Sequence, residues 1–173
     1  MKYPVRRTLY VLTVLLIVLL DQVIKHYVRL FPEGALIGRY PPVFELLHCS
    51  NTGAAFSLLS GHPWFILFAS VLFIGLILIT VNRYIHLTKP GCIGLLFMIS
   101  GALGNMIDRL MFGYVTDYIH LLFIEFPVFN LADILITASA AVMAVLLALD
   151  RLEEKKHSSE NAHGSVDRAH LPK

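Results

Sequence analysis

Charged side chains are scarce in this chain of 173 residues: only 15% of its residues are Asp, Glu, Lys or Arg, whereas 57% are hydrophobic. The mean hydropathy of +0.70 is too high for a typical soluble domain of this length. The net charge is only +2, and no run of basic residues alternates with aromatic ones, which excludes the usual nucleic-acid-binding surfaces. We therefore predict a membrane protein whose surroundings are membrane lipids and which has no nucleic-acid partner.

Cysteine is also nearly absent. Cys49 and Cys92 have neither the number nor the spacing of a disulfide framework or of a metal site. Three histidines fall in the polar C-terminal stretch, where a solvated tail explains them better than a metal site does. We predict two free thiols, no metal and no cofactor.

Four apolar stretches are each long enough to cross a bilayer, which takes roughly 20 residues. They run approximately over residues 8–28, 63–81, 91–110 and 131–149. We therefore predict an all-α membrane protein with four transmembrane helices, which form a single domain over residues 1–150. Residues 151–173 are polar and charged, and we predict a disordered cytoplasmic tail there.

The basic residues are divided unequally between the two sides that these four helices define. Ten of them lie on one side: Lys2, Arg6, Arg7, Arg83, Lys89, Arg151, Lys155, Lys156, Arg168 and Lys173. Four lie on the other: Lys25, Arg29, Arg39 and Arg109. The positive-inside rule then predicts a multi-pass membrane protein with both termini cytoplasmic.

The two predicted outer loops cover residues 29–62 and 111–130. In the first, residues 43–48 have the composition of a strand and residues 51–53 that of a turn. The second is largely apolar, which favours a position along the membrane interface. We expect a small extracytoplasmic β-containing segment and an interfacial loop or helix.

Ionisable residues inside membrane helices are costly, and each is a functional candidate. Asp21 and Lys25 are four residues apart on one helical face, where an ion pair explains them as well as a chemical role does. Asn105, Asp108 and Arg109 share a face of the third apolar stretch, near Gly101 and Gly104. Close helix packing and substrate contact explain that face equally well.

Two further acids are predicted at the same outer boundary. Asn130 is a good N-cap for the fourth helix, and Asp133 would follow it in the first turn, where a carboxylate favours the helix dipole. Taken alone, Asp133 is a capping residue and Asp117 an acid of the interfacial loop. Two carboxylates together in a partly dehydrated region indicate acid–base chemistry.

These residues resemble the lipoprotein signal peptidases (type II signal peptidases), a family of membrane aspartic endopeptidases. The matching pieces occur in order along the chain: Asp21, Gln22 and Lys25; residues 51–57; residues 101–105 with Asp108 and Arg109; Asp117; and residues 129–133. Ser100, Thr116, Tyr118 and Ile134 depart from the pattern that is common in the family.

The resemblance implies that Asp117 and Asp133 are the catalytic pair. It also implies that nine residues bind substrate or support the site: Asp21, Lys25, Asn51, Gly53, Asn105, Asp108, Arg109, Asn130 and Ala132. The implied substrate is a diacylglyceryl-modified prolipoprotein, which is cut just before its lipidated cysteine. It further implies a protein of the bacterial cytoplasmic (inner) membrane, and we expect a monomer whose active site lies toward the outer face of that membrane.

Two other functions are compatible with buried charge in a helix bundle. A small transporter or proton relay would need polar groups spread across the membrane, and residues 63–81 contain almost none. A membrane scaffold would use the polar residues only to hold the helices together, and Asp117 would then be replaceable. The resemblance favours the peptidase.

Overall fold

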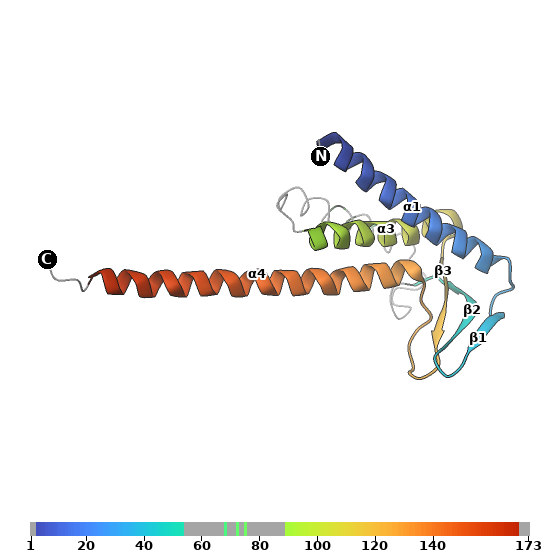
Figure 1. The fold of residues 1–173 in the computed structure, drawn as a ribbon. Helices are drawn as coiled ribbons and strands as arrows, with labels where there is room; N and C mark the ends of the chain where they lie inside the picture. Colours follow the sequence, from blue (N-terminus) through green and yellow to red (C-terminus); the bar gives the residue numbers. More distant parts are fainter. Residues whose placement is uncertain (1–2, 54–67, 69–71, 73–74, 76–88, 170–173) are drawn as a thin grey trace.

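The computed structural model describes residues 3–53, 68, 72, 75 and 89–169. These residues contain three long helices and three strands, in the order α1 (Tyr3–Arg29), β1 (Leu36–Tyr40), β2 (Phe44–Asn51), α3 (Lys89–Phe112), β3 (Val115–Leu121) and α4 (Leu131–Ala169) (Figure 1). The transmembrane helix predicted at residues 63–81 lies outside the described residues apart from three positions, so four spanning helices remain a prediction.

All three long helices contain a stretch that is long and apolar enough to cross a membrane, at Arg7–Arg29, Pro90–Phe112 and Leu131–Leu149. Half of the residues in the α3 stretch are buried, against 11% in each of the other two. Helix α3 lies between α1 and α4 and packs against both (Figure 1). The exposed faces of α1 and α4 carry large hydrophobic side chains, as expected where lipid takes the place of water.

The three strands form an antiparallel sheet in the order β1-β2-β3. The strand expected near residues 43–48 is β2. Strand β3 corrects the prediction that residues 111–130 form an interfacial loop, because Asp117 lies in the middle of a strand and pairs with Cys49 across the sheet. Residues Val115 to Tyr118 are buried, so β3 shows no alternation of exposed and buried positions that its sequence could have revealed.

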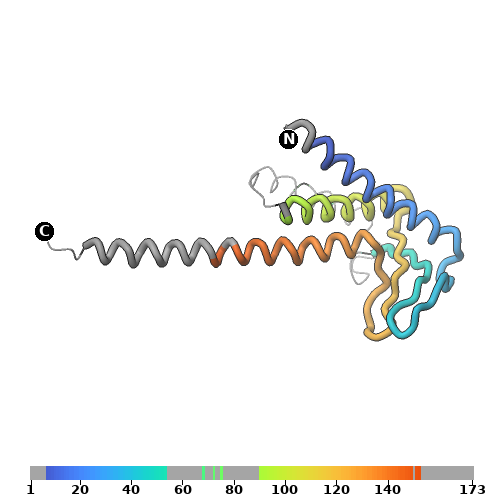
Figure 2. Tube along the Cα trace, in the orientation of Figure 1, coloured from blue at the N-terminus to red at the C-terminus, as the bar shows by residue number. Residues whose placement is uncertain are grey.

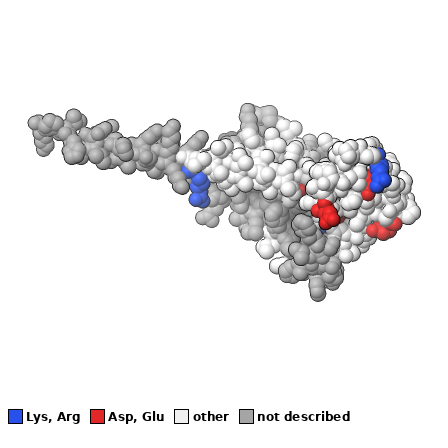
Figure 3. All heavy atoms as spheres, turned by 90° about the horizontal axis from the view of Figure 1, so that it is seen from below, with Lys and Arg blue, Asp and Glu red and all other residues white. Residues whose placement is uncertain are grey.

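The sheet lies at one end of the helices, where α1 and α3 end and α4 begins (Figure 2). Its far end is formed by the β1–β2 turn and the loop after β3, which are joined by a hydrogen bond from the Leu122 N–H to the Val43 carbonyl. On the face shown in Figure 3, both acidic and basic side chains are visible at this end, whereas the described surface along the helices is largely uncharged. The described structure therefore exposes charged side chains at the sheet end and is largely apolar along the helices.

Glycines on α3 allow the neighbouring helices to approach closely. A Cβ atom added at Gly101 would lie 2.5 Å from the Ala132 carbonyl oxygen of α4, and one added at Gly104 would overlap the Asp21 carboxylate of α1. Small residues at helix contacts are the usual means of close packing in membranes. The packing role that the sequence suggested for these two glycines is confirmed.

Helix α4 extends beyond its predicted membrane stretch into the segment for which the sequence predicts a disordered tail. The helix continues without a break from Leu131 to Ala169, through most of the polar segment over residues 151–173. Ala, Glu, Lys and Arg, which favour helix, are frequent between residues 150 and 162, and no proline follows residue 127 until Pro172. The apolar run of the sequence marks the membrane stretch of α4 and not the end of the helix.

We predict that Gly101→Ala lowers the free energy of unfolding by about 1–3 kcal/mol, because its methyl group has no space against α4. The matched control is Gly94→Ala on the same helix, whose Cβ would make ordinary contacts with Met143 at 3.7 and 3.8 Å. The control is expected to be neutral or slightly stabilising, since alanine favours helix. Thermal unfolding in detergent measures both, and equal midpoints would contradict the assigned packing.

Candidate active site

Asp117 on β3 is buried and has both carboxylate oxygens occupied by amide donors. Asn130 donates to Oδ1 at 2.6 Å, and Asn51 on β2 donates to Oδ2 at 2.9 Å. The pKa of the Asp117 carboxyl is raised to about 7: burial raises it most, the neighbouring Asp133 raises it too, and the two amide donors partly offset these effects. Asp117 is thus an acid that can hold or release a proton near neutral pH.

Asp133 lies in the first turn of α4 and forms a reciprocal cap with Asn130. The Asp133 N–H donates to Asn130 Oδ1, and the Asn130 N–H donates to Asp133 Oδ2, both at 3.1 Å. Each of these bonds satisfies a main-chain donor at the helix start, so the capping roles predicted for both residues are confirmed. Asp133 Oδ1 accepts a third hydrogen bond, at 2.8 Å, from the side chain of Asn105 on α3.

A second cluster lies behind Asn105 and is built around Lys25 of α1, which is completely buried. The Lys25 ammonium lies 2.9 Å from Asp21 and 3.3 Å from Asp108, and it donates to Asn105 Oδ1 at 2.7 Å. The ion pair predicted between Asp21 and Lys25 is therefore present, but it includes Asp108 and continues through Asn105 to Asp133.

Asp108 connects this cluster to the sheet. Its Oδ2 accepts the Thr116 N–H at 3.0 Å, and its Oδ1 accepts hydrogen bonds from Gln22 at 3.1 Å and Arg29 at 3.3 Å. Arg29 also donates to the Thr116 hydroxyl at 2.9 Å. The start of β3 is thus held against α1 and α3 just before Asp117.

Arg109 contacts main-chain oxygens and not the paired acids. Its guanidinium donates to the carbonyls of Asn105 at 3.4 Å and Gly53 at 3.3 Å. The Gly53 N–H in turn donates to Asn51 Oδ1 at 2.9 Å, which fixes the amide that reaches Asp117. Ala132 is fully buried at the α3–α4 contact beside Gly101 and Gly104. All eleven predicted site residues therefore lie in the two connected clusters or beside them.

Four residues that complete these clusters were not assigned to the site by the sequence analysis. Gln22 and Arg29 bind Asp108, the Thr116 hydroxyl accepts from Arg29, and the Tyr118 hydroxyl accepts the Leu131 N–H at the start of α4. Arg29 had a visible signal, since Asp21, Lys25 and Arg29 recur every four residues on one face of α1. Thr116 and Tyr118 stood out only as departures from the family pattern.

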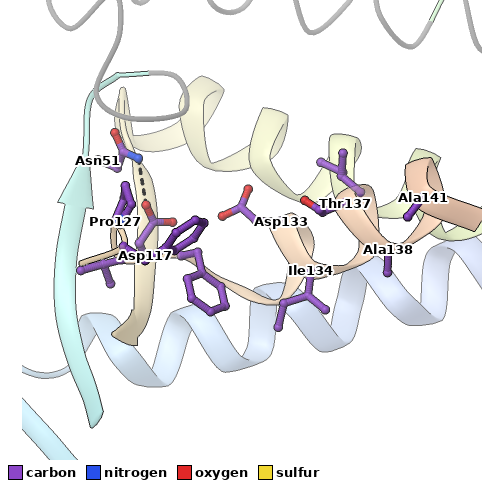
Figure 4. A pocket seen from close by; sticks show the side chains of 12 residues that line it. Asn51, Asp117, Pro127, Asp133, Ile134, Thr137, Ala138 and Ala141 are labelled. Carbon is purple, nitrogen blue, oxygen red and sulfur yellow. Dashed lines mark hydrogen bonds between the residues drawn. The ribbon is translucent and has the colours of Figure 1, made fainter. Parts of the chain in front are cut away.

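Asp117 and Asp133 open into a pocket with a volume of about 670 Å³. Their side chains point toward each other at one end of it, while Ile134, Thr137, Ala138 and Ala141 extend it along α4 (Figure 4). Phe126 to Phe129, from the segment between β3 and α4, also line it. The site therefore combines two facing carboxyls with a largely apolar wall.

No group of three or more His, Cys, Asp or Glu side chains with the arrangement of a metal site occurs in the described part of the chain. The two acids are instead surrounded by amide donors, which bind carboxylates and do not bind cations. The absence of a metal and of a cofactor stays a prediction.

The fold is that of a bacterial membrane enzyme. A solved structure described as a bacterial membrane enzyme at 2.3 Å resolution superimposes with a TM-score of 0.78 at 25% sequence identity, covering 83% of this chain and 90% of the other. A second, at 1.9 Å resolution, gives a TM-score of 0.73 at 25% identity and covers 81% and 92% of the two chains.

The sequence comparisons identify the family. The family profile described as Signal peptidase (SPase) II matches residues 13–149. Lipoprotein signal peptidases from Streptococcus pyogenes serotypes M5 (strain Manfredo) and M18 (strain MGAS8232) are each 37% identical over 143 residues, which is 82% of this chain and 94% of theirs. This chain belongs to the signal peptidase II family and is a membrane protease, as the sequence motifs indicated.

We predict that Asn51→Leu raises the pKa of Asp117 above about 7, because the variant loses an N–H that stabilises the ionised carboxylate. A pH titration of the Asp117 carboxyl by ¹³C NMR measures the pKa. The matched control is Ser50→Ala, since Ser50 is the adjacent residue on β2 but binds Glu33. An Asp117 pKa that falls or stays constant in Asn51→Leu would contradict the assigned hydrogen bond.

Proposed function

We propose that the chain is an aspartic endopeptidase that removes the signal peptide from diacylglyceryl-modified prolipoproteins, with Asp117 and Asp133 as its catalytic pair. The single observation that carries this proposal is the position of the two carboxyls, which face each other at one end of an apolar pocket. Neither carboxyl forms an ion pair with a basic side chain in the described structure, so both are available for proton transfer.

Two carboxyls held close together in a water-poor site do not easily ionise at the same time, so the pair holds one proton between them. The ionised carboxylate takes a proton from water as the water attacks the scissile carbonyl. The protonated carboxyl donates a hydrogen bond to the carbonyl oxygen and later protonates the leaving amine. The water supplies the hydroxyl group of the new carboxylate, so this mechanism requires neither a metal nor a covalent intermediate.

The shape and chemistry of the pocket suit a substrate that lies in the membrane. A signal peptide is largely apolar, and the wall formed by Ile134, Thr137, Ala138 and Ala141 runs from the acids along a spanning stretch of α4. The lipidated cysteine would then remain at the membrane boundary, beside the acids, and the cut falls just before it. The name of the streptococcal relatives, lipoprotein signal peptidase, supports the same substrate.

We place this site at the outer face of the cytoplasmic membrane with both termini in the cytoplasm, and we expect the enzyme to act as a monomer among membrane lipids. The excess of Lys and Arg on the side opposite to the sheet supports this orientation. The enzyme would then bind a prolipoprotein where its signal peptide leaves the outer half of the bilayer.

A transporter or proton relay is less well supported by the positions of the buried charges. In the described helices, Asp21, Lys25 and Asp108 are buried close to the sheet end, and α4 is largely apolar from Ile134 to Leu149. An ion path needs polar groups at successive depths. This distribution suits a site at one boundary.

We predict that Asp117→Asn and Asp133→Asn each lower kcat at least about 100-fold, because either change removes one partner of the acid–base pair. Both variants are expected to accumulate at normal levels, since asparagine keeps the shape of the side chain. The matched control is Glu45→Gln, which changes an acid of the sheet that binds His120 and Arg39 outside the pocket. Turnover near that of the wild type in either aspartate variant would exclude the catalytic pair.

We also predict that purified wild-type enzyme cleaves a diacylglyceryl-modified prolipoprotein at least about tenfold faster than the same precursor without lipid. The acyl chains partition into the membrane and hold the cleavage site at the depth of the two acids, which raises its effective concentration there. Mass spectrometry of the products gives both the rate and the cleavage position. Equal rates for the two substrates would refute the lipid requirement.

A further inference from the structure

The environment of Lys25 is unusual for a buried cation. Its ammonium has three N–H donors and three acceptors on α1 and α3, namely Asn105 Oδ1 at 2.7 Å, Asp21 Oδ2 at 2.9 Å and Asp108 Oδ2 at 3.3 Å. The shortest of the three contacts is to the neutral amide and not to a carboxylate. The third N–H of the buried ammonium is thus satisfied by an amide that also donates to Asp133.

The contact to Lys25 is the shortest of the three contacts that favour one orientation of the Asn105 amide. Asn105 Oδ1 accepts from Lys25 at 2.7 Å and from Asn130 at 3.2 Å, so its Nδ2 is directed at Asp133 Oδ1 at 2.8 Å. In the opposite orientation the amide NH₂ would face an ammonium that only donates, and the amide oxygen would face a carboxylate. Lys25 therefore favours the one orientation in which Asn105 donates to Asp133.

We propose that Lys25 is a positioning residue for the reaction, which fixes the Asn105 amide so that it donates to Asp133 and holds that carboxylate ready to act as the base. This inference rests on the proposed peptidase function. Asp117 receives both of its donors from Asn51 and Asn130, so it does not depend on Lys25 in the same way. Asn130 donates to both acids, but only Asp133 also accepts from Asn105 and is connected through it to Lys25.

Loss of Lys25 should change the ionisation of Asp133, which can be measured separately from any loss of protein stability. Without the ammonium, Asn105 Oδ1 keeps only the longer hydrogen bond from Asn130, so the amide is held less firmly and donates less of the time to Asp133, which disfavours the ionised form of the base. Turnover then falls, and the acidic limb of the pH–rate profile moves to higher pH. The other charged or titratable groups around Asp133 are Asp117 and Tyr118 on β3 and Arg109 on α3, and none of them is changed in this comparison.

The competing explanation is that Lys25 only compensates the charges of Asp21 and Asp108. These two acids differ in their remaining partners. Asp108 keeps Arg29, Gln22 and the Thr116 N–H when Lys25 is removed, whereas Asp21 keeps only Gln22, and its Oδ1 has no hydrogen-bond partner in the described structure. The paired change Lys25→Met with Asp21→Asn therefore removes one buried cation together with the anion that depends on it most.

The test measures cleavage of a diacylglyceryl-modified prolipoprotein by full-length wild type and by Lys25→Met/Asp21→Asn. We expect at least a tenfold loss of kcat in the double variant, less than a threefold change in KM, and an acidic limb displaced to higher pH. Arg39→Met/Glu45→Gln is the matched control, because it removes an ion pair at the exposed side of the sheet. A double variant with the kcat and pH profile of the wild type would overturn the positioning role.

A double-mutant cycle separates positioning from general damage to the fold. Asn105→Leu removes the amide but leaves both ion pairs of Lys25 in place, and it should reproduce the loss of kcat and the shift of the acidic limb. In the Asn105→Leu background, the further change Lys25→Met/Asp21→Asn should alter kcat less than threefold. Losses that multiply independently would contradict action through Asn105.

A failure of the variants to fold and a failure of the proposed function give different results in these experiments. If the Lys25 variants do not fold, Asn105→Leu alone decides the inference, because wild-type turnover and an unshifted acidic limb in that variant would overturn it. If folded wild type does not cleave the lipidated precursor at all, the proposed function fails before the role of Lys25 is reached.

Discussion

Charge buried at a membrane boundary must be compensated within the protein, and this requirement organises the sheet end of the molecule. An isolated ion moved out of water costs several kcal/mol, which a partner or a proton must offset. In the described residues the two connected clusters contain four aspartates, and the adjacent cations are Lys25, Arg29 and Arg109. One proton held between Asp117 and Asp133 makes this group neutral. The shared proton that the proposed mechanism needs is therefore also what the charge balance of the fold favours.

The elements that hold these charges also hold the catalytic geometry. Asn130 begins α4 by capping it and, with the same side chain, donates to Asp117, so the start of a spanning helix is fixed relative to β3. Glycines 101 and 104 let α3 approach α4 and α1 closely enough for Asn105 and Asp21 to lie in one network. Substitutions at these glycines would change the separation of the paired acids as well as the stability of the bundle. Packing and chemistry are thus coupled through a few short contacts.

Sequence reasoning recovered the parts of the fold that depend on local composition. A bilayer sets a minimum length for apolar runs, so the spans in α1, α3 and α4 were located to within a few residues. It missed β3 because residues Val115 to Tyr118 are all buried and show no strand period, and the pairing of β3 with β2 joins residues 64 or more positions apart. The family motifs identified residues that the structure brings close together. They did not reveal which atoms meet, since the orientation of the Asn105 amide depends on three different elements.

The central claim is that Asp117 and Asp133 share one proton. The most direct measurement is the infrared spectrum of protein labelled with ¹³C-aspartate, compared with the spectra of Asp117→Asn and Asp133→Asn, as the pH is raised from 5 to 9. The account predicts one protonated carboxyl from this pair near pH 6, which is absent when Asp117 is replaced and which disappears from the wild-type spectrum as the pH passes about 7. A pair that is fully ionised at pH 6, or one in which both carboxyls are protonated there, would contradict the account.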